Sequence, residues 1–208
     1  MKAYENSKKN SKPFFCFNVT MQNHAAYSEN LSPYGLKKIT SNVKDASTKT
    51  ETENYASLQK ASDAALKKLI NYFEKQKEET IILFFGDHQP MFAKDVYTEL
   101  NGKNADNLSL AESTRFYKVP YLLWSNKKIN VKLPEVTSIN YLSSLIYEVG
   151  SIKKPWNIQY NLELMEKYPV VTANFVMDNK NNLLNSMEVV DAINKKSVTG
   201  DLQKLKIY

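Results

Sequence analysis

The chain has very little cysteine, arginine or histidine: one cysteine, one arginine and two histidines in 208 residues. The single Cys16 cannot form a disulfide within the chain, which excludes a disulfide-stapled scaffold. Because Cys16 stands in an apolar segment, we expect a buried, unreactive thiol. No Arg-rich helix, RNP-like motif or zinc-finger spacing is present, and the lysines are largely interleaved with acidic residues. Nucleic-acid binding is therefore not expected, despite a formal net charge of +6.

Long hydrophobic runs are also missing. A helix that crosses a bilayer needs about 20 consecutive apolar residues, and no segment approaches this length. No signal peptide is visible either. The mild positive charge could attract anionic substrates or lipid head groups, although solubility explains it equally well.

What the chain does contain is typical of a globular α/β domain. Hydrophobic residues make up 42% and aromatic residues 12%, which argues against disorder. Apolar runs and helical periods alternate along the sequence, as in an α/β fold. The predicted strands are Phe14–Thr20, Ile81–Phe85, Val119–Trp124, Val170–Met177 and Leu183–Val189. The predicted helices are Tyr55–Gln76, a helix from Ile139 to Val149 between Ser138 and Gly150, and Ile158–Tyr168, with a long loop over residues 25–54.

The segment TIILFFGDHQP combines a strand with two potential metal ligands. Five consecutive apolar residues, Ile81–Phe85, are typical of a strand covered on both faces, as in a parallel sheet. Gly86 permits a sharp turn, so Asp87 and His88 should stand at the carboxyl end of a central strand, where open α/β sheets place their active sites. A carboxylate beside an imidazole suits a divalent metal. The same pair could instead cap a helix or close a turn.

A second segment repeats this design. Residues 13–24 read PFFCFNVTMQNH, which is a predicted strand over Phe14–Thr20 followed by a polar tip that ends at His24. Taken alone, His24 is more typical of a loop histidine than of a ligand. Both histidines of the chain, however, follow such strands. This repeated placement favours a shared site.

Together these segments resemble a known family. PFFCFNVTMQNHAAY and IILFFGDHQP are similar to the lipoteichoic acid synthase-like sulfatase family, within the alkaline phosphatase superfamily. Further pieces follow in the family's order: NYASLQKASDAALKKLINYF resembles its helix between the two strands, YKVPYLLWSN the following strand, and SINYLSSLIYEVG the helix beyond. The resemblance covers most of the chain up to about Gly150 and is looser after that.

The resemblance implies a fold and a division of the chain. The fold would be part of an alkaline phosphatase-like sandwich, with a central, mostly parallel sheet flanked by helices and a small C-terminal antiparallel sheet. Residues 1–12 would be a polar tail or helix remnant. Residues 13–150 would be the C-terminal part of the catalytic domain, and residues 151–208 a helix with the small sheet.

The resemblance also implies an activity, namely metal-dependent transfer or hydrolysis of phosphate or sulfate esters outside the cytoplasm. Asp87 and His88 would be metal ligands, and His24 would contact the phosphate or sulfate group. The expected metal is manganese, with magnesium or zinc as alternatives. Asn23 and Gln89 are candidates for supporting residues beside these three.

One departure from the family limits this prediction. Its Thr or Ser nucleophile and an early acidic ligand precede the strand that matches Phe14–Thr20, and residues 1–12 contain no such motif. The chain would therefore be the C-terminal portion of a larger domain and inactive alone. Its parent would be anchored by upstream helices at the outer face of a bacterial membrane.

Two further expectations follow. The substrate stays open between glycerol phosphate from a lipid, phosphoethanolamine and a sulfate ester. A non-catalytic α/β binding or assembly module is the alternative function. In either case a sheet without its first strands exposes an edge, so we expect the chain to self-associate or to be only marginally stable.

Overall fold

The computed structural model describes residues 1–10, 12–24, 26–28, 35–186 and 189. The chain forms two compact units, Met1–Lys127 and Lys128–Tyr208. Within the described ranges, no helix has the length and apolar character required to cross a membrane. Both units mix helices with short strands, so the predicted α/β class is confirmed.

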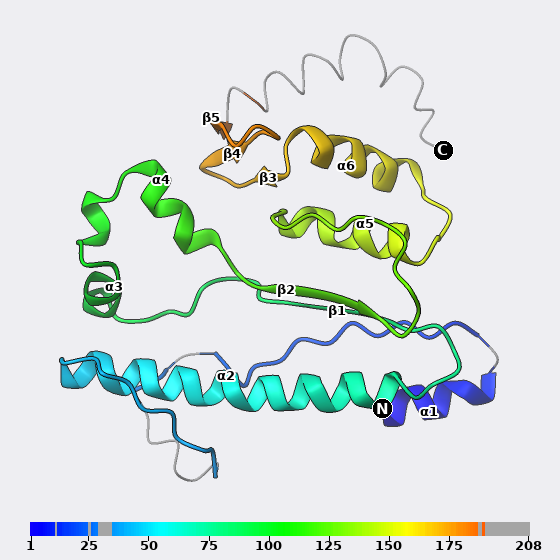
Figure 1. The fold of residues 1–208 in the computed structure, drawn as a ribbon, viewed down its shortest axis with the longest axis horizontal. Coiled ribbons are helices and arrows are strands. Elements are labelled where there is room, and N and C mark those ends of the chain that lie inside the picture. The colour runs from blue at the N-terminus through cyan, green and yellow to red at the C-terminus, as the bar shows by residue number, and fades with distance from the viewer. Residues whose placement is uncertain (11, 25, 29–34, 187–188, 190–208) are drawn as a thin grey trace. The chain divides into compact units, whose positions relative to one another are not determined.

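The first unit contains one long helix, several short ones and a pair of strands (Figure 1). In chain order, its elements are α1 (Lys2–Ser7), η1 (Lys8–Asn10), α2 (Ala46–Phe73), β1 (Ile81–Phe85), α3 (Lys94–Asn101), η3 (Ala105–Asn107), α4 (Leu110–Ser113), η4 (Thr114–Tyr117) and β2 (Tyr121–Ser125).

The two strands of this unit pair antiparallel, with Ile81 opposite Ser125 and Phe85 opposite Tyr121. The prediction of mostly parallel pairing is wrong for these strands. Five apolar residues suggested cover on both faces, but β1 is half-buried and Phe84 is 39% exposed. A two-stranded antiparallel sheet can leave one face open, and an apolar run alone does not tell the two pairing senses apart.

The strand predicted over Phe14–Thr20 does not form. This segment is drawn as an extended trace without strand pairing (Figure 1), and every residue in it is exposed. Phe15 is 83% exposed, and Cys16 is exposed rather than buried. A strand requires a partner for its backbone groups, and none of the other described residues provides one here.

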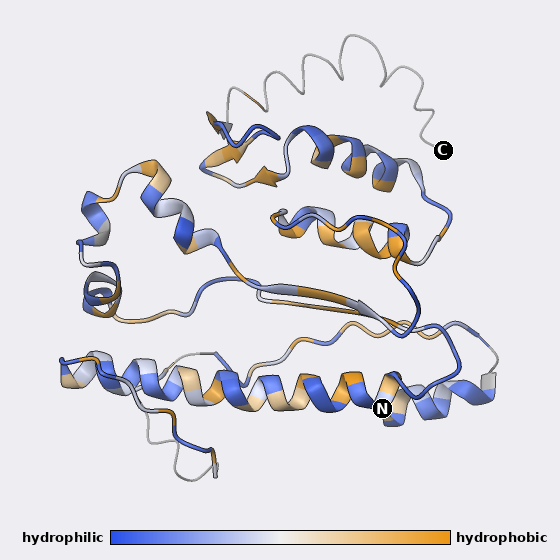
Figure 2. Ribbon diagram, viewed as in Figure 1, coloured by the Kyte–Doolittle hydropathy of each residue, from blue (hydrophilic) through white to orange (hydrophobic). Residues whose placement is uncertain are grey.

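Helix α2 begins nine residues before its predicted start. Asp45 is the N-cap, and its carboxylate accepts a hydrogen bond from the Thr48 amide at 2.8 Å. The first turns carry no apolar period, and Figure 2 shows them as largely hydrophilic. These turns are stabilised by the N-cap and by threonine hydroxyls that donate hydrogen bonds to backbone carbonyls. One example is the bond from Thr52 Oγ1 to Thr48 O at 2.7 Å.

The described part of the second unit contains two helices and a three-stranded antiparallel sheet in the order β3-β4-β5. Its elements are α5 (Ile139–Val149), α6 (Trp156–Lys167), β3 (Val170–Val171), β4 (Phe175–Met177) and β5 (Leu183–Asn185). The predicted bounds of α5 are confirmed, and so is the hairpin around Asp178. The strand predicted over Val170–Met177 is instead two short strands joined by a turn.

Buried residues of the second unit form a small core on one face of α5. They include Tyr141, Leu142 and Leu145, together with Ile158, Phe175 and Val176. Ser138 ties the start of α5 to β3, because its hydroxyl accepts from Val171 N at 2.6 Å and donates to Val171 O at 2.9 Å.

Candidate functional site

Asp87 and His88 follow β1 directly and lie beside one another at the surface. Their side chains are 78% and 56% exposed, and Asp87 Oδ2 lies 3.7 Å from His88 Nε2. The other carboxylate oxygen of Asp87 accepts a hydrogen bond from the His88 amide at 3.0 Å. This turn fixes both donor groups on the same side of the loop.

The hydrogen bond of the other ring nitrogen of His88 determines the tautomer of the imidazole. Nδ1 lies 2.7 Å from the backbone oxygen of Gln89. A carbonyl oxygen can only accept, so Nδ1 carries a proton, and in the neutral imidazole the lone pair is then on Nε2. Metal-binding histidines have this arrangement, in which one nitrogen donates to a carbonyl and the other faces the metal. The ring is therefore oriented to bind a metal through Nε2, next to Asp87.

The donor atoms fit part of a metal site. Two donors about 2.1 Å from one tetrahedral ion lie about 3.4 Å apart, close to the observed 3.7 Å. A catalytic site typically needs three protein ligands. Across the described ranges, no group of three or more His, Cys, Asp and Glu side chains could hold an ion. In a metal site, Asp87 and His88 would thus supply two ligands of an incomplete set.

The loop that carries these donors is anchored to the segment before β2. Gly86 N donates to Pro120 O at 3.1 Å, and a Cβ on Gly86 would lie 3.1 Å from Val119 Cβ. The two backbone segments therefore approach each other closely at Gly86. This close approach explains the presence of glycine at this position better than a turn that requires glycine. The side-chain amide of Gln89 donates to Lys118 O, which places this predicted supporting residue in the anchor.

His24 occupies a turn next to α2, and its amide donates to Met21 O at 3.1 Å. The two residues before it attach the turn to the helix. Gln22 Nε2 donates to Leu58 O at 3.3 Å, and Asn23 Nδ2 donates to Ser62 Oγ at 3.0 Å. Asn23, the other predicted supporting residue, therefore contacts α2 and holds the turn that carries His24.

An aromatic cluster connects the loops of the two histidines, and it was not apparent from the sequence. Tyr27 lies three residues after His24, and Phe92 lies four residues after His88. Their ring centroids are 5.3 Å apart, and Tyr55 of α2 lies 5.3 Å from both. Burial raises the pKa of the Tyr27 and Tyr55 hydroxyls. The cluster brings the two loops into one region of the first unit, although the aromatic residues are too far apart in sequence to reveal it.

The cluster continues into an open depression beside His88. Tyr97 follows Phe92 at a centroid distance of 5.7 Å, and its ring meets that of Phe116 at 5.3 Å, edge to face. The depression is lined by His88, Gln89, Met91, Lys94, Tyr97 and Phe116. Lys94 lies 2.7 Å from the Asp106 carboxylate, so its charge is already paired. The depression offers mainly apolar surface next to the imidazole.

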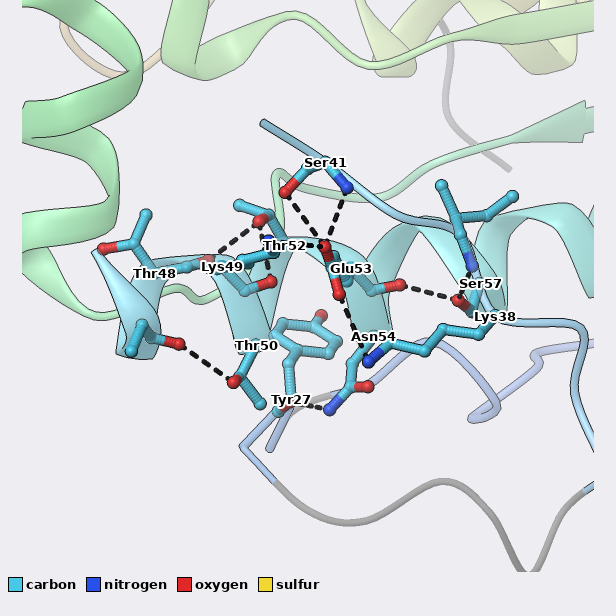
Figure 3. A network of polar contacts seen from close by, with 12 residues as sticks. Tyr27, Lys38, Ser41, Thr48, Lys49, Thr50, Thr52, Glu53, Asn54 and Ser57 are labelled. Carbon is cyan, nitrogen blue, oxygen red and sulfur yellow. Dashed lines mark hydrogen bonds and ion pairs between the residues drawn. The ribbon is translucent and has the colours of Figure 1, made fainter. Parts of the chain in front are cut away.

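Helix α2 also holds the segment that follows Tyr27 (Figure 3). The carboxylate of Glu53, a residue only 3% exposed, accepts from Ser41 N at 2.7 Å and lies 3.4 Å from Lys38 Nζ. The hydrogen bond from the Ser41 amide, assisted by the Lys38 charge, holds the Glu53 pKa below its ordinary value. Ser57 Oγ accepts from Ile39 N at 2.9 Å. Part of the predicted long loop is therefore fixed along α2.

Comparisons with known proteins relate most of the chain to one family. A family model described as Sulfatase matches residues 1–150. A protein of Rhizobium meliloti (strain 1021), named as a cyclic beta-1,2-glucan modification protein, is 26% identical over 195 residues. That alignment covers 92% of this chain but only 29% of the relative, so the chain spans less than a third of the relative's length. No solved structure matches the chain.

Proposed function

Because this chain belongs to the sulfatase family, we propose that it is part of an enzyme that transfers or hydrolyses phosphate or sulfate esters with the help of a divalent metal. Sulfatases are generally metal-dependent. The observation that carries the proposal is the Asp87–His88 pair, in which the Gln89 carbonyl orients the imidazole so that Nε2 and a carboxylate oxygen lie 3.7 Å apart.

Asp87 and His88 would hold the metal, and His24 would bind the substrate. A bound metal would polarise an ester oxygen and favour a deprotonated nucleophile. His24 would donate a hydrogen bond to the phosphate or sulfate oxygens, where negative charge grows in the transition state. Asn23 would keep His24 in place through α2, and Gln89 would keep the His88 ring in its metal-binding orientation. The nucleophile and the remaining ligands are assigned to no residue of this chain.

The finer identity of the reaction is also a proposal. We favour manganese as the metal, with magnesium or zinc as alternatives, and a lipoteichoic acid synthase-like transfer of glycerol phosphate at the outer face of a bacterial membrane. The relative is named for the modification of a cyclic beta-1,2-glucan, which supports a glucan as the acceptor. A lipid-linked glycerol phosphate, a phosphoethanolamine group and a sulfate ester share the anionic oxygens that His24 would contact.

Metal titration tests the central step without requiring activity. Calorimetry with Mn²⁺ and then Zn²⁺ should show binding by the chain, at least tenfold weaker in Asp87→Ala and in His88→Ala. Asp63→Ala is the control, because it removes an exposed carboxylate on α2, away from the loop after β1. This variant should bind the metal like the parent chain. In ¹⁵N spectra without metal, His88 should carry its proton on Nδ1. Equal binding by all four proteins would refute the assignment of these ligands.

One observation favours the alternative, a binding or assembly module without catalysis. It is the absence, within the described ranges, of a third acidic, His or Cys ligand near Asp87 and His88. The two functions differ in turnover. With Mn²⁺ and the probes bis-p-nitrophenyl phosphate and p-nitrocatechol sulfate, hydrolysis that disappears in Asp87→Ala would eliminate the module. Metal binding without turnover would favour the module or an enzyme completed by other residues.

A further inference from the structure

The depression beside His88 has the size of a site for a small organic group. Its volume is about 560 Å³, within the range of roughly 300–1,000 Å³ that is typical of small-molecule sites. All of its lining residues belong to the connection between β1 and β2, and we call the space that they enclose the apolar depression. They are His88, Gln89, Met91, Lys94, Tyr97 and Phe116.

The polar side chains of this lining already have partners in the protein. The side-chain amide of Gln89 donates to a backbone carbonyl, and the hydroxyl of Tyr97 donates to Pro90 O. The ammonium group of Lys94 lies 2.7 Å from the carboxylate of Asp106. A ligand hydroxyl that enters the depression would therefore lose its water without a ready replacement, which is unfavourable. The lining favours an apolar group over a sugar or a glycerol.

The walls of the depression are fixed to each other and to α2. The rings of Tyr97 on α3 and Phe116 on η4 meet edge to face at a centroid distance of 5.3 Å. Arg115 Nη1 donates to Asn101 Oδ1 at 3.0 Å, which joins η4 to the end of α3. The N-cap amide of α3 donates to Glu51 Oε2 of α2 at 3.1 Å. Walls that are held in place need little further ordering when a ligand binds.

His88 belongs both to this lining and to the metal pair. Its imidazole borders the depression, and its Nε2 lies 3.7 Å from the carboxylate of Asp87. An ester whose anionic oxygens bind a metal at this pair would therefore bring its organic group next to the depression.

We propose that the apolar depression binds the organic group of the substrate ester, an alkyl or aryl group, while the phosphate or sulfate oxygens face the metal pair. The inference rests on the proposed function for the position of the metal. It adds a substrate class, namely an amphiphilic ester that is anionic at one end and apolar at the other. It also assigns Met91, Tyr97 and Phe116 as the residues that select the apolar end.

Calorimetry with alkyl phosphates tests the proposal on the whole chain in the presence of Mn²⁺. Hexyl phosphate and methyl phosphate carry the same anionic group and differ by five methylenes. A fully buried methylene strengthens binding roughly fourfold. Because burial in an open depression is partial, we expect hexyl phosphate to bind roughly tenfold tighter or more than methyl phosphate. Glycerol 1-phosphate should bind like methyl phosphate, since its hydroxyls gain no partner in the depression.

Two substitutions connect this preference to the lining. Met91→Gln makes one wall polar at a similar side-chain length, and Met91 is 67% exposed, so the fold should stay intact by circular dichroism. This variant should reduce the preference for hexyl over methyl phosphate several-fold and leave Mn²⁺ binding unchanged. Leu100→Gln is the matched control, because Leu100 is 54% exposed on α3 outside the lining. It should leave the affinities for both phosphates unchanged.

Phenyl phosphate distinguishes an aryl from an alkyl group. Edge-to-face contacts with the rings of Tyr97 and Phe116 would favour a phenyl group. Tighter binding of phenyl than of hexyl phosphate, reduced in Phe116→Leu, would identify an aryl ester. The opposite order, with little effect of Phe116→Leu, would identify an alkyl chain such as that of a lipid.

The proposal and the metal site fail in different ways. Equal binding of methyl and hexyl phosphate in the presence of Mn²⁺, or an unchanged preference in Met91→Gln, would overturn the proposal and leave the metal site in place. Phosphate binding that depends neither on Mn²⁺ nor on Asp87 would refute the proposed function instead. A metal-free titration with 1-hexanol separates the two. The ¹³C methyl signal of Met91, assigned with Met91→Gln, should shift, and an unchanged signal would overturn the apolar site whatever the metal does.

Discussion

Replacing Phe92 by leucine should loosen both histidine loops at once. Phe92 lies four residues after His88, and its ring contacts the rings of Tyr27, Tyr55 and Tyr97 at 5.3, 5.3 and 5.7 Å. Tyr27 in turn lies three residues after His24. The phenyl ring is therefore the link between the two loops, and leucine keeps most of its apolar bulk without the edge-to-face contacts.

The expected loss of stability follows from these three contacts. An aromatic pair contributes about 0.5–1.5 kcal/mol beyond its buried area. Three pairs would give roughly 1.5–4.5 kcal/mol, and the value should lie toward the lower end because Phe92 is only half-buried. We expect a free energy of unfolding lower by about 2 kcal/mol. With a typical urea dependence, this lowers the urea midpoint by about 1 M.

The chain has only two histidines, which makes the local effect easy to observe. Proton NMR should show two resolved imidazole C–H signals, assigned with His24→Gln. In Phe92→Leu both should shift and broaden, because each loop loses its anchor. Trp156→Leu removes an exposed aromatic from the second unit and should move neither signal. An unchanged urea midpoint, or a shift of the His88 signal alone, would refute the idea that the cluster joins the loops.

Two further predictions concern residues in the connection between β1 and β2. Gly86→Ala should destabilise the first unit by about 1–3 kcal/mol, because its Cβ would lie 3.1 Å from Val119 Cβ. Val119→Gly removes that Cβ, so it should lower the urea midpoint less in the Gly86→Ala chain than in the parent chain. The second concerns Glu112, whose pKa is lowered from 4.5 to about 2 by hydrogen bonds from the Lys103 ammonium and from Ser109. Since the folded-state pKa is depressed, the cap should stabilise α4 fully above about pH 4.5 and lose this effect as the pH falls toward 2. Carboxyl ¹³C titration should show the low midpoint, and Lys103→Gln should raise it; a midpoint near 4.5 in the parent chain would contradict the capping geometry.

Much of the local structure could be predicted from the sequence where local signals agree. The bounds of β1 match the apolar run Ile81–Phe85, and α5 begins after Ser138 and ends at Gly150. The hairpin around Asp178 also matches, because its carboxylate accepts from Lys180 N and Asn182 N in the turn. In each case a signal that is local in the sequence decides the backbone: an apolar run, the residues that flank a helix, or a turn residue.

The features that could not be predicted depend on partners distant in sequence. The first turns of α2 lack an apolar period, and Glu53 is buried there because Ser41 and Lys38 reach it from the preceding segment. The antiparallel sense of β1 and β2 is not encoded in either strand alone. The apolar segment Phe14–Thr20 predicted a strand, but a strand pairs only with a neighbour, which the sequence of the segment does not identify. At the site, the adjacency of Asp87 and His88 is given by the sequence, whereas the contact of His88 Nδ1 with the Gln89 carbonyl is not.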